Sequence, residues 1–203
     1  MAVIDSAERL ATLIGQPSPV VVRKFHDHLT AQAQDFLTRS TLAFLATVDA
    51  GGNPMVSPRG DRPGFLQVRS RRELLVPERS GNRLASALHN IVDNGRVALT
   101  ALVPGTGEML RVEGTACLDD DRELCAELAS RGKPARLAIR VTPTRCYFHC
   151  AKALLRSEVW QPGTWPTPLA VSFGQEIAEN GGLAEHEIHA FDEGVQGRYR
   201  TDL

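Results

Sequence analysis

The residues best suited to bind an anion lie in the segment PERSGNRL, residues 77–84. A strand-like apolar pattern ends where this segment starts, and a helical pattern begins near Arg83. Because the first backbone N–H groups of a helix have no partner within the helix, a helix start suits a phosphate. Ser80, Asn82 and Arg83 would add two short polar groups and a fixed positive charge. An ordinary helix cap, with Ser80 or Asn82 satisfying the first turn, explains the same residues equally well.

A second segment, NPMVSPRGDRPGFLQV at 53–68, places Ser57 and Arg59 two residues apart in an expected strand. Alternate residues of a strand face the same side, so these two side chains would point together. An arginine directed into or across a barrel is costly unless it meets an anion. The alternative is a solvated Arg59 on an exposed edge, with Asp61 pairing with it or shaping the turn.

A third segment, RCYFHCAKALLRSEVW at 145–160, follows the end of a strand with a short helical stretch. Lys152, Arg156 and Trp160 recur every four residues, so they would share one helix face. A basic face that ends in an indole can bind a flat, anionic, conjugated ligand through charge and stacking. The alternative is a solvated face with Trp160 packed beneath it.

Metal-ligating residue types also occur in this segment, at Cys146, His149 and Cys150. They lack the second half of a structural zinc site, and on a strand His149 would face away from the two cysteines. We therefore expect no metal site.

Short strands dominate the middle of the chain, and they must position these residues. The expected strands cover residues 41–48, 54–58, 64–69, 74–77, 96–103, 109–118 and 136–149. The expected helices cover residues 5–14, 25–39, 83–93, 120–130, 151–160 and 169–179, and a polar tail follows. Several hairpin links and no regular alternation of strands with helices predict an antiparallel, closed or nearly closed barrel.

Composition sets the broad class of the protein. The chain has 203 residues, of which 42% are hydrophobic and 23% charged, and its formal net charge is −1. These values are typical of a globular protein, and they give no general attraction to nucleic acid or to anionic membranes. No apolar stretch approaches a membrane span, and the N-terminus lacks the apolar core of a signal peptide. Four cysteines without a paired framework indicate reduced thiols, so we expect a cytoplasmic location.

Taken together, the segments resemble the pyridoxamine 5'-phosphate oxidase-like FMN-binding family, which has a split β-barrel fold. The resemblance covers roughly residues 38–165. The segments that carry it are FLATV (44–48), VSPRGDRPGF (56–65), PERSGNRL (77–84), MLRVEG (109–114) and HCAKALLRSEVW (149–160).

The resemblance implies a site at the interface of a homodimer. The FMN phosphate would be held by Ser80, Asn82 and Arg83, with help from Ser57 and Arg59. The flavin ring would lie along residues 55–57 and 76–78. The residues expected to reach the partner's flavin are Lys152, Arg156, Ser157 and Trp160.

The C-terminus departs from the family pattern. True pyridoxamine phosphate oxidases end in an arginine-rich motif that grips the substrate phosphate, whereas this chain ends in GVQGRYRTDL. The resemblance therefore implies that the flavin is retained while the substrate differs.

These observations predict a mainly β (α+β) protein, an antiparallel split β-barrel with flanking helices. The expected organisation is an N-terminal helical segment (1–40), an FMN-binding barrel (41–165) and a C-terminal helix and tail (166–203). The expected function is a homodimeric FMN oxidoreductase acting on an unidentified small-molecule substrate or electron donor. The alternatives are a non-catalytic flavin-binding or storage protein, and a haem- or deazaflavin-binding relative on the same barrel.

Overall fold

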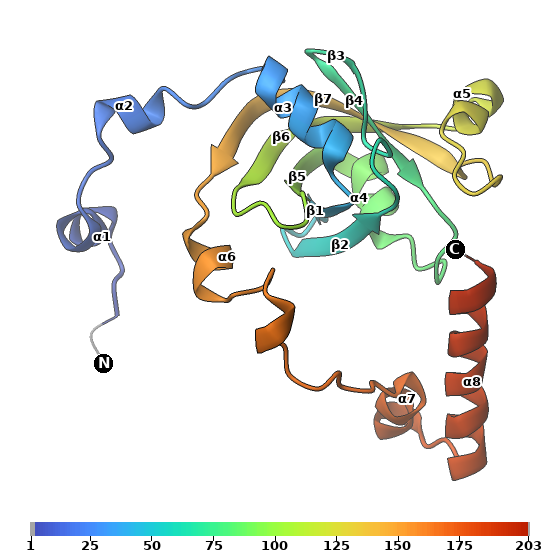
Figure 1. Cartoon of the computed structure of the whole chain (residues 1–203). Coiled ribbons are helices and arrows are strands. Elements are labelled where there is room, and N and C mark those ends of the chain that lie inside the picture. The colour runs from blue at the N-terminus through green and yellow to red at the C-terminus, as the bar shows by residue number, and fades with distance from the viewer. Residues whose placement is uncertain (1–2, 203) are drawn as a thin grey trace.

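The computed structural model describes residues 3–202 and is built around a curled antiparallel sheet (Figure 1). The spatial order of its seven strands is β2-β1-β5-β6-β7-β4-β3. The strands are β1 (Leu42–Val48), β2 (Pro54–Gly60), β3 (Gln67–Ser70), β4 (Glu73–Glu78), β5 (Arg96–Leu102), β6 (Met109–Asp119) and β7 (Leu137–His149). This confirms the expected mainly β, α+β class and the antiparallel sheet with flanking helices.

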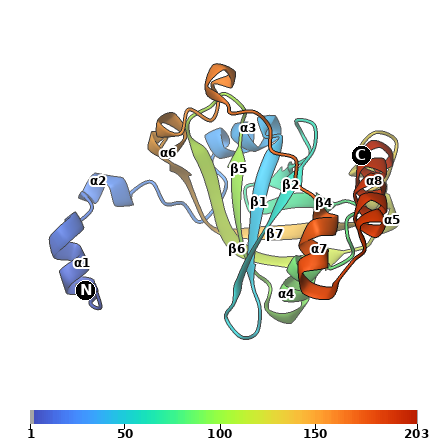
Figure 2. The ribbon, with the colours of Figure 1, turned by 90° about the horizontal axis from the view of Figure 1, so that it is seen from below.

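Short helices cover the sheet and extend from both of its ends (Figure 2). The helices are α1 (Ala7–Ile14), α2 (Pro19–Val22), α3 (Ala31–Arg39), α4 (Ser86–Asn94), α5 (Arg122–Glu127), α6 (Lys152–Arg156), η1 (Pro162–Thr164), α7 (Phe173–Gly181) and α8 (Glu185–Thr201). α3 packs against β3, β6 and β7, whereas α4 packs mainly against β1 and β6. Within residues 3–202, no helix is long and apolar enough to cross a membrane.

The register of the β1–β2 hairpin decides which side chains point inward. Leu45 lies opposite Ser57, and Ala43 lies opposite Arg59. Directly opposed residues of an antiparallel pair face the same side of the sheet. Because Ala43 and Leu45 are fully buried in the core, Ser57 and Arg59 are directed to the same inner side. The expectation that Ser57 and Arg59 share a face is confirmed.

The core fills the inside of this curled sheet. Its fully buried large side chains are Leu29, Leu37, Leu45, Leu66, Leu74, Leu75, Val76, Leu99, Leu110, Val112, Ile139 and Val141. Those on β1, β5 and β6 alternate with exposed or half-buried residues, which is the pattern that predicted the strands, whereas Leu74, Leu75 and Val76 follow one another on β4.

The second helix begins later than expected, at Ala31 instead of residue 25. The Thr30 side chain caps it by accepting a hydrogen bond of 3.2 Å from the Ala33 backbone N–H. Before this cap, His26 and Cys146 exchange two backbone hydrogen bonds of 3.0 and 2.7 Å. This extended pairing alongside β7 is incompatible with a helix over residues 25–29.

The helix expected at 83–93 also begins later, at Ser86. Arg83 and Ala85 both adopt left-handed backbone conformations, with φ of 65° and 51°, so they cannot belong to a right-handed helix. Similarly, the helical stretch expected at 151–160 is confined to α6, and Glu158 beyond it has φ of 51°.

The polar tail expected after residue 179 is instead the longest helix of the chain, α8. It packs along α7, and the Glu187 carboxylate accepts a hydrogen bond of 2.8 Å from the Ala184 backbone N–H at its start. Val195 is its only buried residue among those that the structure describes. With so narrow an apolar stripe, α8 has little of the hydrophobic periodicity that identifies a helix from sequence.

We predict that Gly114→Ala destabilises the protein by about 1–3 kcal/mol, because overpacking forces the backbone to shift. Gly114 lies at the bulge between β6 and β7, where a Cβ would come 2.1 Å from the carbonyl oxygen of Thr142. The free energy of unfolding in urea measures the effect. Gly197→Ala is the matched control, because a Cβ there meets nothing within 4 Å on α8. Equal stability of Gly114→Ala and the wild type would contradict the prediction.

Candidate functional site

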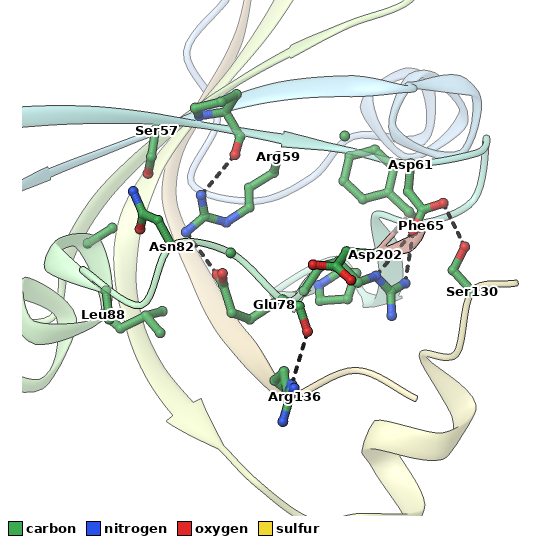
Figure 3. Close-up of a pocket in the computed structure, with 18 of the residues that line it drawn as sticks. Ser57, Arg59, Asp61, Phe65, Glu78, Asn82, Leu88, Ser130, Arg136 and Asp202 are labelled. Atoms are coloured by element: carbon green, nitrogen blue, oxygen red, sulfur yellow. Dashed lines mark hydrogen bonds and ion pairs between the residues drawn. The ribbon is translucent and has the colours of Figure 1, made fainter. Parts of the chain in front are cut away.

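A cavity of about 630 Å³ opens at the mouth of the barrel, within the usual size range of small-molecule sites (Figure 3). It is lined by parts of residues 55–61, by Phe65, by residues 77–82 and 84–88, by parts of residues 130–136, and by Asp202. Its charged lining residues are Arg59, Arg79, Arg131, Lys133 and Arg136, with Asp61, Glu78 and Asp202. Cations therefore outnumber carboxylates in the lining.

Arg59 extends from β2 across the cavity to β4. Its Nη2 lies 2.8 Å from Glu78 Oε2, and its Nη1 donates a hydrogen bond of 2.9 Å to the carbonyl oxygen of Pro58 (Figure 3). The Arg59 side chain is only 13% exposed, so the solvated alternative is wrong. Burial raises the pKa of Glu78, and the opposing charge and hydrogen bond of Arg59 do not offset this effect completely.

A second ion pair in the lining joins Arg79 and Asp61. Arg79 contacts Asp61 Oδ2 through its Nη2 at 3.0 Å, and Ser130 Oγ donates a hydrogen bond of 2.7 Å to Asp61 Oδ1. Burial alone would raise the pKa of Asp61, but the hydrogen bonds and the charge of Arg79 outweigh it and lower that pKa. The alternative interpretation of the sequence pairs Asp61 with Arg59. In the structure, Asp61 pairs with Arg79 instead.

Three donors in the lining lack a protein partner. Ser57 Oγ, Arg59 Nε and Arg79 Nη1 are buried and have no hydrogen-bond partner among residues 3–202. Leaving a buried donor unsatisfied typically costs about 1–3 kcal/mol, and more when it is charged. All three belong to residues that line one cavity, so a single ligand with several acceptor oxygens can satisfy them together. A phosphate group has this chemistry.

The loop at 79–85 carries the remaining predicted phosphate ligands. Ser80 and Asn82 line the cavity, while Arg83 follows them and is exposed. Ser80 Oγ accepts a hydrogen bond of 3.2 Å from Arg136 Nε, and Asn82 Oδ1 accepts one of 3.1 Å from the Leu84 backbone N–H. Neither side chain caps α4, so the helix-cap alternative is wrong.

The structure does not bring the third predicted segment to this cavity. Lys152, Arg156, Ser157 and Trp160 are absent from its described lining. Trp160 lies beyond the end of α6, and its Nε1 donates a hydrogen bond of 2.8 Å to the carbonyl oxygen of Thr106. The indole is therefore part-buried against the β5–β6 turn, instead of continuing a helical face from Lys152 and Arg156.

Sequence reasoning missed several lining residues. Arg79 stands inside the segment PERSGNRL but was not among the expected ligands. Nothing local indicates that it pairs with Asp61, or that Glu78, which was expected along the flavin ring, pairs with Arg59. Arg131, Lys133, Arg136 and Asp202 carry no recognisable motif. They reach the cavity only because the loop after α5 and the end of α8 fold against it. Within the described residues, no cluster of three or more His, Cys, Asp or Glu side chains is arranged to hold a metal ion.

Comparison with known proteins identifies the family. A family model described as pyridoxamine 5'-phosphate oxidase matches residues 29–150. A comparison with proteins of curated function finds no significant match.

Three solved structures illustrate the similarity. A Lactobacillus delbrueckii protein, named as a candidate pyridoxamine 5'-phosphate oxidase, is 31% identical, with a TM-score of 0.47 over 60% of this chain and 95% of that one. HupZ from Group A Streptococcus is 20% identical, with a TM-score of 0.48 over 59% of this chain and 92% of that one. An FMN-binding protein from Syntrophomonas wolfei is 11% identical, with a TM-score of 0.47 over 70% of this chain and 94% of that one.

The matched residues 29–150 contain all seven strands and most of the cavity lining, including Ser57, Arg59, Glu78 and Arg79. With its antiparallel split barrel, this chain belongs to the pyridoxamine 5'-phosphate oxidase family.

Proposed function

We propose that the protein binds FMN, with the phosphate in the cavity between β2 and the loop at 79–85. The observation that carries this proposal is the set of unpartnered buried donors, Ser57 Oγ, Arg59 Nε and Arg79 Nη1. They fit the phosphate of FMN because a phosphate offers several charged acceptor oxygens to converging donors. Ser80, Asn82 and Arg83 complete the proposed phosphate site from the loop.

The same cavity suits the flavin ring. Met55 and Ser57 from β2 and Pro77 and Glu78 from β4 line the same cavity. We propose that the ring lies along residues 55–57 and 76–78, within a flavin-binding barrel spanning residues 41–165. When bound, FMN would supply hydride transfer, and this chain would supply its binding, orientation and electrostatic environment. The proposed activity is that of a cytoplasmic oxidoreductase with a small-molecule substrate or electron donor.

A homodimer accounts for the residues that the cavity leaves out. β2 ends the sheet order, and Phe44 and Val56, which share the outer face of β1 and β2, expose 39% and 62% of their surface. Apolar side chains gathered at a sheet edge favour a protein partner. In a two-fold assembly, the partner's copies of Lys152, Arg156, Ser157 and Trp160 would approach the flavin that this chain holds.

The absorbance spectrum of the purified protein tests the cofactor. We expect flavin bands, and mass analysis of the released cofactor should identify FMN, because the cavity offers one compact phosphate site. FAD, haem or a deazaflavin as the dominant species would overturn the proposal. Rapid mixing with NADPH then separates an oxidoreductase, whose flavin is reduced, from a storage protein, whose flavin stays oxidised.

We predict that Arg83→Ala weakens FMN binding roughly 10- to 150-fold, because a charge-assisted bond to phosphate contributes about 1.5–3 kcal/mol. Arg83 makes no ion pair or side-chain hydrogen bond within residues 3–202, so its removal leaves no protein partner unsatisfied. Titration of the apoprotein with FMN gives the dissociation constant. Arg83 is itself absent from the described lining, so the prediction rests on its place in the loop at 79–85. Arg122→Ala is the matched control, since Arg122 is equally exposed but belongs to α5 and not to that loop. An unchanged dissociation constant would make Arg83 a surface residue only.

We predict that mixed dimers regain cofactor binding. One parent carries Arg83→Ala, and the other carries Arg156→Ala together with Trp160→Ala. If each site combines a phosphate loop from one protomer with α6 from the other, a heterodimer has one intact site and one doubly damaged site. Flavin occupancy of the mixture should then exceed that of either parent. No gain in occupancy, although native mass spectrometry detects heterodimers, would show that each site is built within one chain.

A further inference from the structure

The C-terminal end of α8 closes one side of the cavity, which the sequence did not indicate. Asp202 lines the cavity directly, and Lys133 Nζ donates a hydrogen bond of 2.6 Å to the carbonyl oxygen of Thr201. In Figure 1, α8 extends away from the barrel, and its C-terminal end is the part that lies nearest to the barrel. This helix therefore meets the site through its last residues.

The surface under this end is cationic. Arg59 and Arg79 are paired with Glu78 and Asp61, which leaves Arg131, Lys133 and Arg136 as the cations of the lining without a carboxylate partner among residues 3–202. Arg131 makes no ion pair or side-chain hydrogen bond among the described residues. The only other carboxylate in the described lining is that of Asp202.

The end of α8 brings negative charge to these cations. The last carbonyl groups of a helix have no partner within the helix, and they carry a partial negative charge. Asp202 adds a full negative charge at the same end. Arg198 and Arg200 stand in the last turn, but neither lines the cavity. On the side of the cavity, the helix end thus presents a carboxylate and a carbonyl oxygen near the cations that would attract a phosphate.

This end is held loosely. The Lys133–Thr201 hydrogen bond is exposed, and such contacts contribute little to stability. The α7–α8 pair follows η1 through residues 165–172, which have no regular structure and are mostly exposed. An end attached in this way can leave the cavity while α7 and α8 stay packed together.

We propose that the C-terminal end of α8 is a displaceable latch: the Thr201 carbonyl oxygen, held by Lys133, and the adjacent Asp202 carboxylate lie at the cationic side of the cavity, and a phosphate-bearing ligand must displace them. The helix end competes with the ligand for the cavity as an anion attached to the same chain. Its local concentration is therefore set by the length of the connecting segment and not by the protein concentration in solution. This proposal concerns how access to the proposed FMN site is regulated. It rests on the proposed function only in taking FMN as the natural ligand.

The test uses inorganic pyrophosphate as the probe, titrated by calorimetry into the full chain, as purified and after removal of bound flavin. We expect Asp202→Asn to bind pyrophosphate about two- to fivefold more tightly than the wild type, because one competing surface charge is removed. The asparagine oxygen can still accept the hydrogen bond that Thr201 Oγ1 donates to Asp202. The matched control is Glu193→Gln, an exposed α8 carboxylate outside the described lining, which should leave the affinity unchanged.

A second measurement follows the helix itself. With saturating pyrophosphate, hydrogen exchange at residues 198–202 should become faster, because the last turn loses its contact with Lys133. Slower exchange would overturn the latch in favour of a lid that closes over the ligand. Equal affinity of Asp202→Asn and the wild type, or no pyrophosphate binding by either, would also overturn it. If purified protein carries no flavin, the FMN assignment fails, yet the pyrophosphate titration still decides whether the latch exists.

Discussion

The ion pair between Arg59 and Glu78 is the contact on which the cavity depends. The two residues come from β2 and β4, which lie on either side of the β1-β5-β6-β7 group in the sheet order. Their contact across the barrel mouth therefore links parts of the sheet that no backbone hydrogen bond joins. Because the β1–β2 register pairs Arg59 with buried Ala43, the arginine side chain points to the inner side of the hairpin. The Glu78 carboxylate on β4 compensates the charge of the part-buried Arg59 inside the barrel mouth.

That compensation is incomplete, and it leaves buried donors that the proposed phosphate would use. The raised pKa of Glu78 indicates that burial disfavours its negative charge even beside Arg59. Arg59 Nε, Ser57 Oγ and Arg79 Nη1 remain without partners among the described residues. A phosphate accepting from these donors recovers hydrogen bonds that folding alone leaves unmade. The structure thus places these unsatisfied polar groups where a ligand can use them, instead of dispersing them through the core.

The proposed ligand-binding groups come both from the barrel and from two more loosely attached segments, the loop at 79–85 and the end of α8. β2 holds the donors of Ser57 and Arg59 on a strand whose position is set by its register and packing. The loop at 79–85 and the end of α8 contribute charge from elements with few buried residues. Binding groups on the barrel can be positioned accurately, whereas those on the loop and helix end can respond to what is bound.

The sequence by itself determined the strands, the shared face of Ser57 and Arg59, and the family, because alternating burial and turn residues are local signals. It also identified Ser80 and Asn82 beside the cavity from residue type alone. Only the tertiary structure decided that Arg59 pairs with Glu78 and Arg79 with Asp61, since register and barrel closure join segments distant in sequence. The left-handed backbone at Arg83 and Ala85 was unforeseen because such φ values are unusual outside glycine. No motif marked four further lining residues, which are Arg131, Lys133, Arg136 and Asp202. They line the cavity only because the loop after α5 and the end of α8 lie against the barrel, and sequence patterns do not reveal such an arrangement.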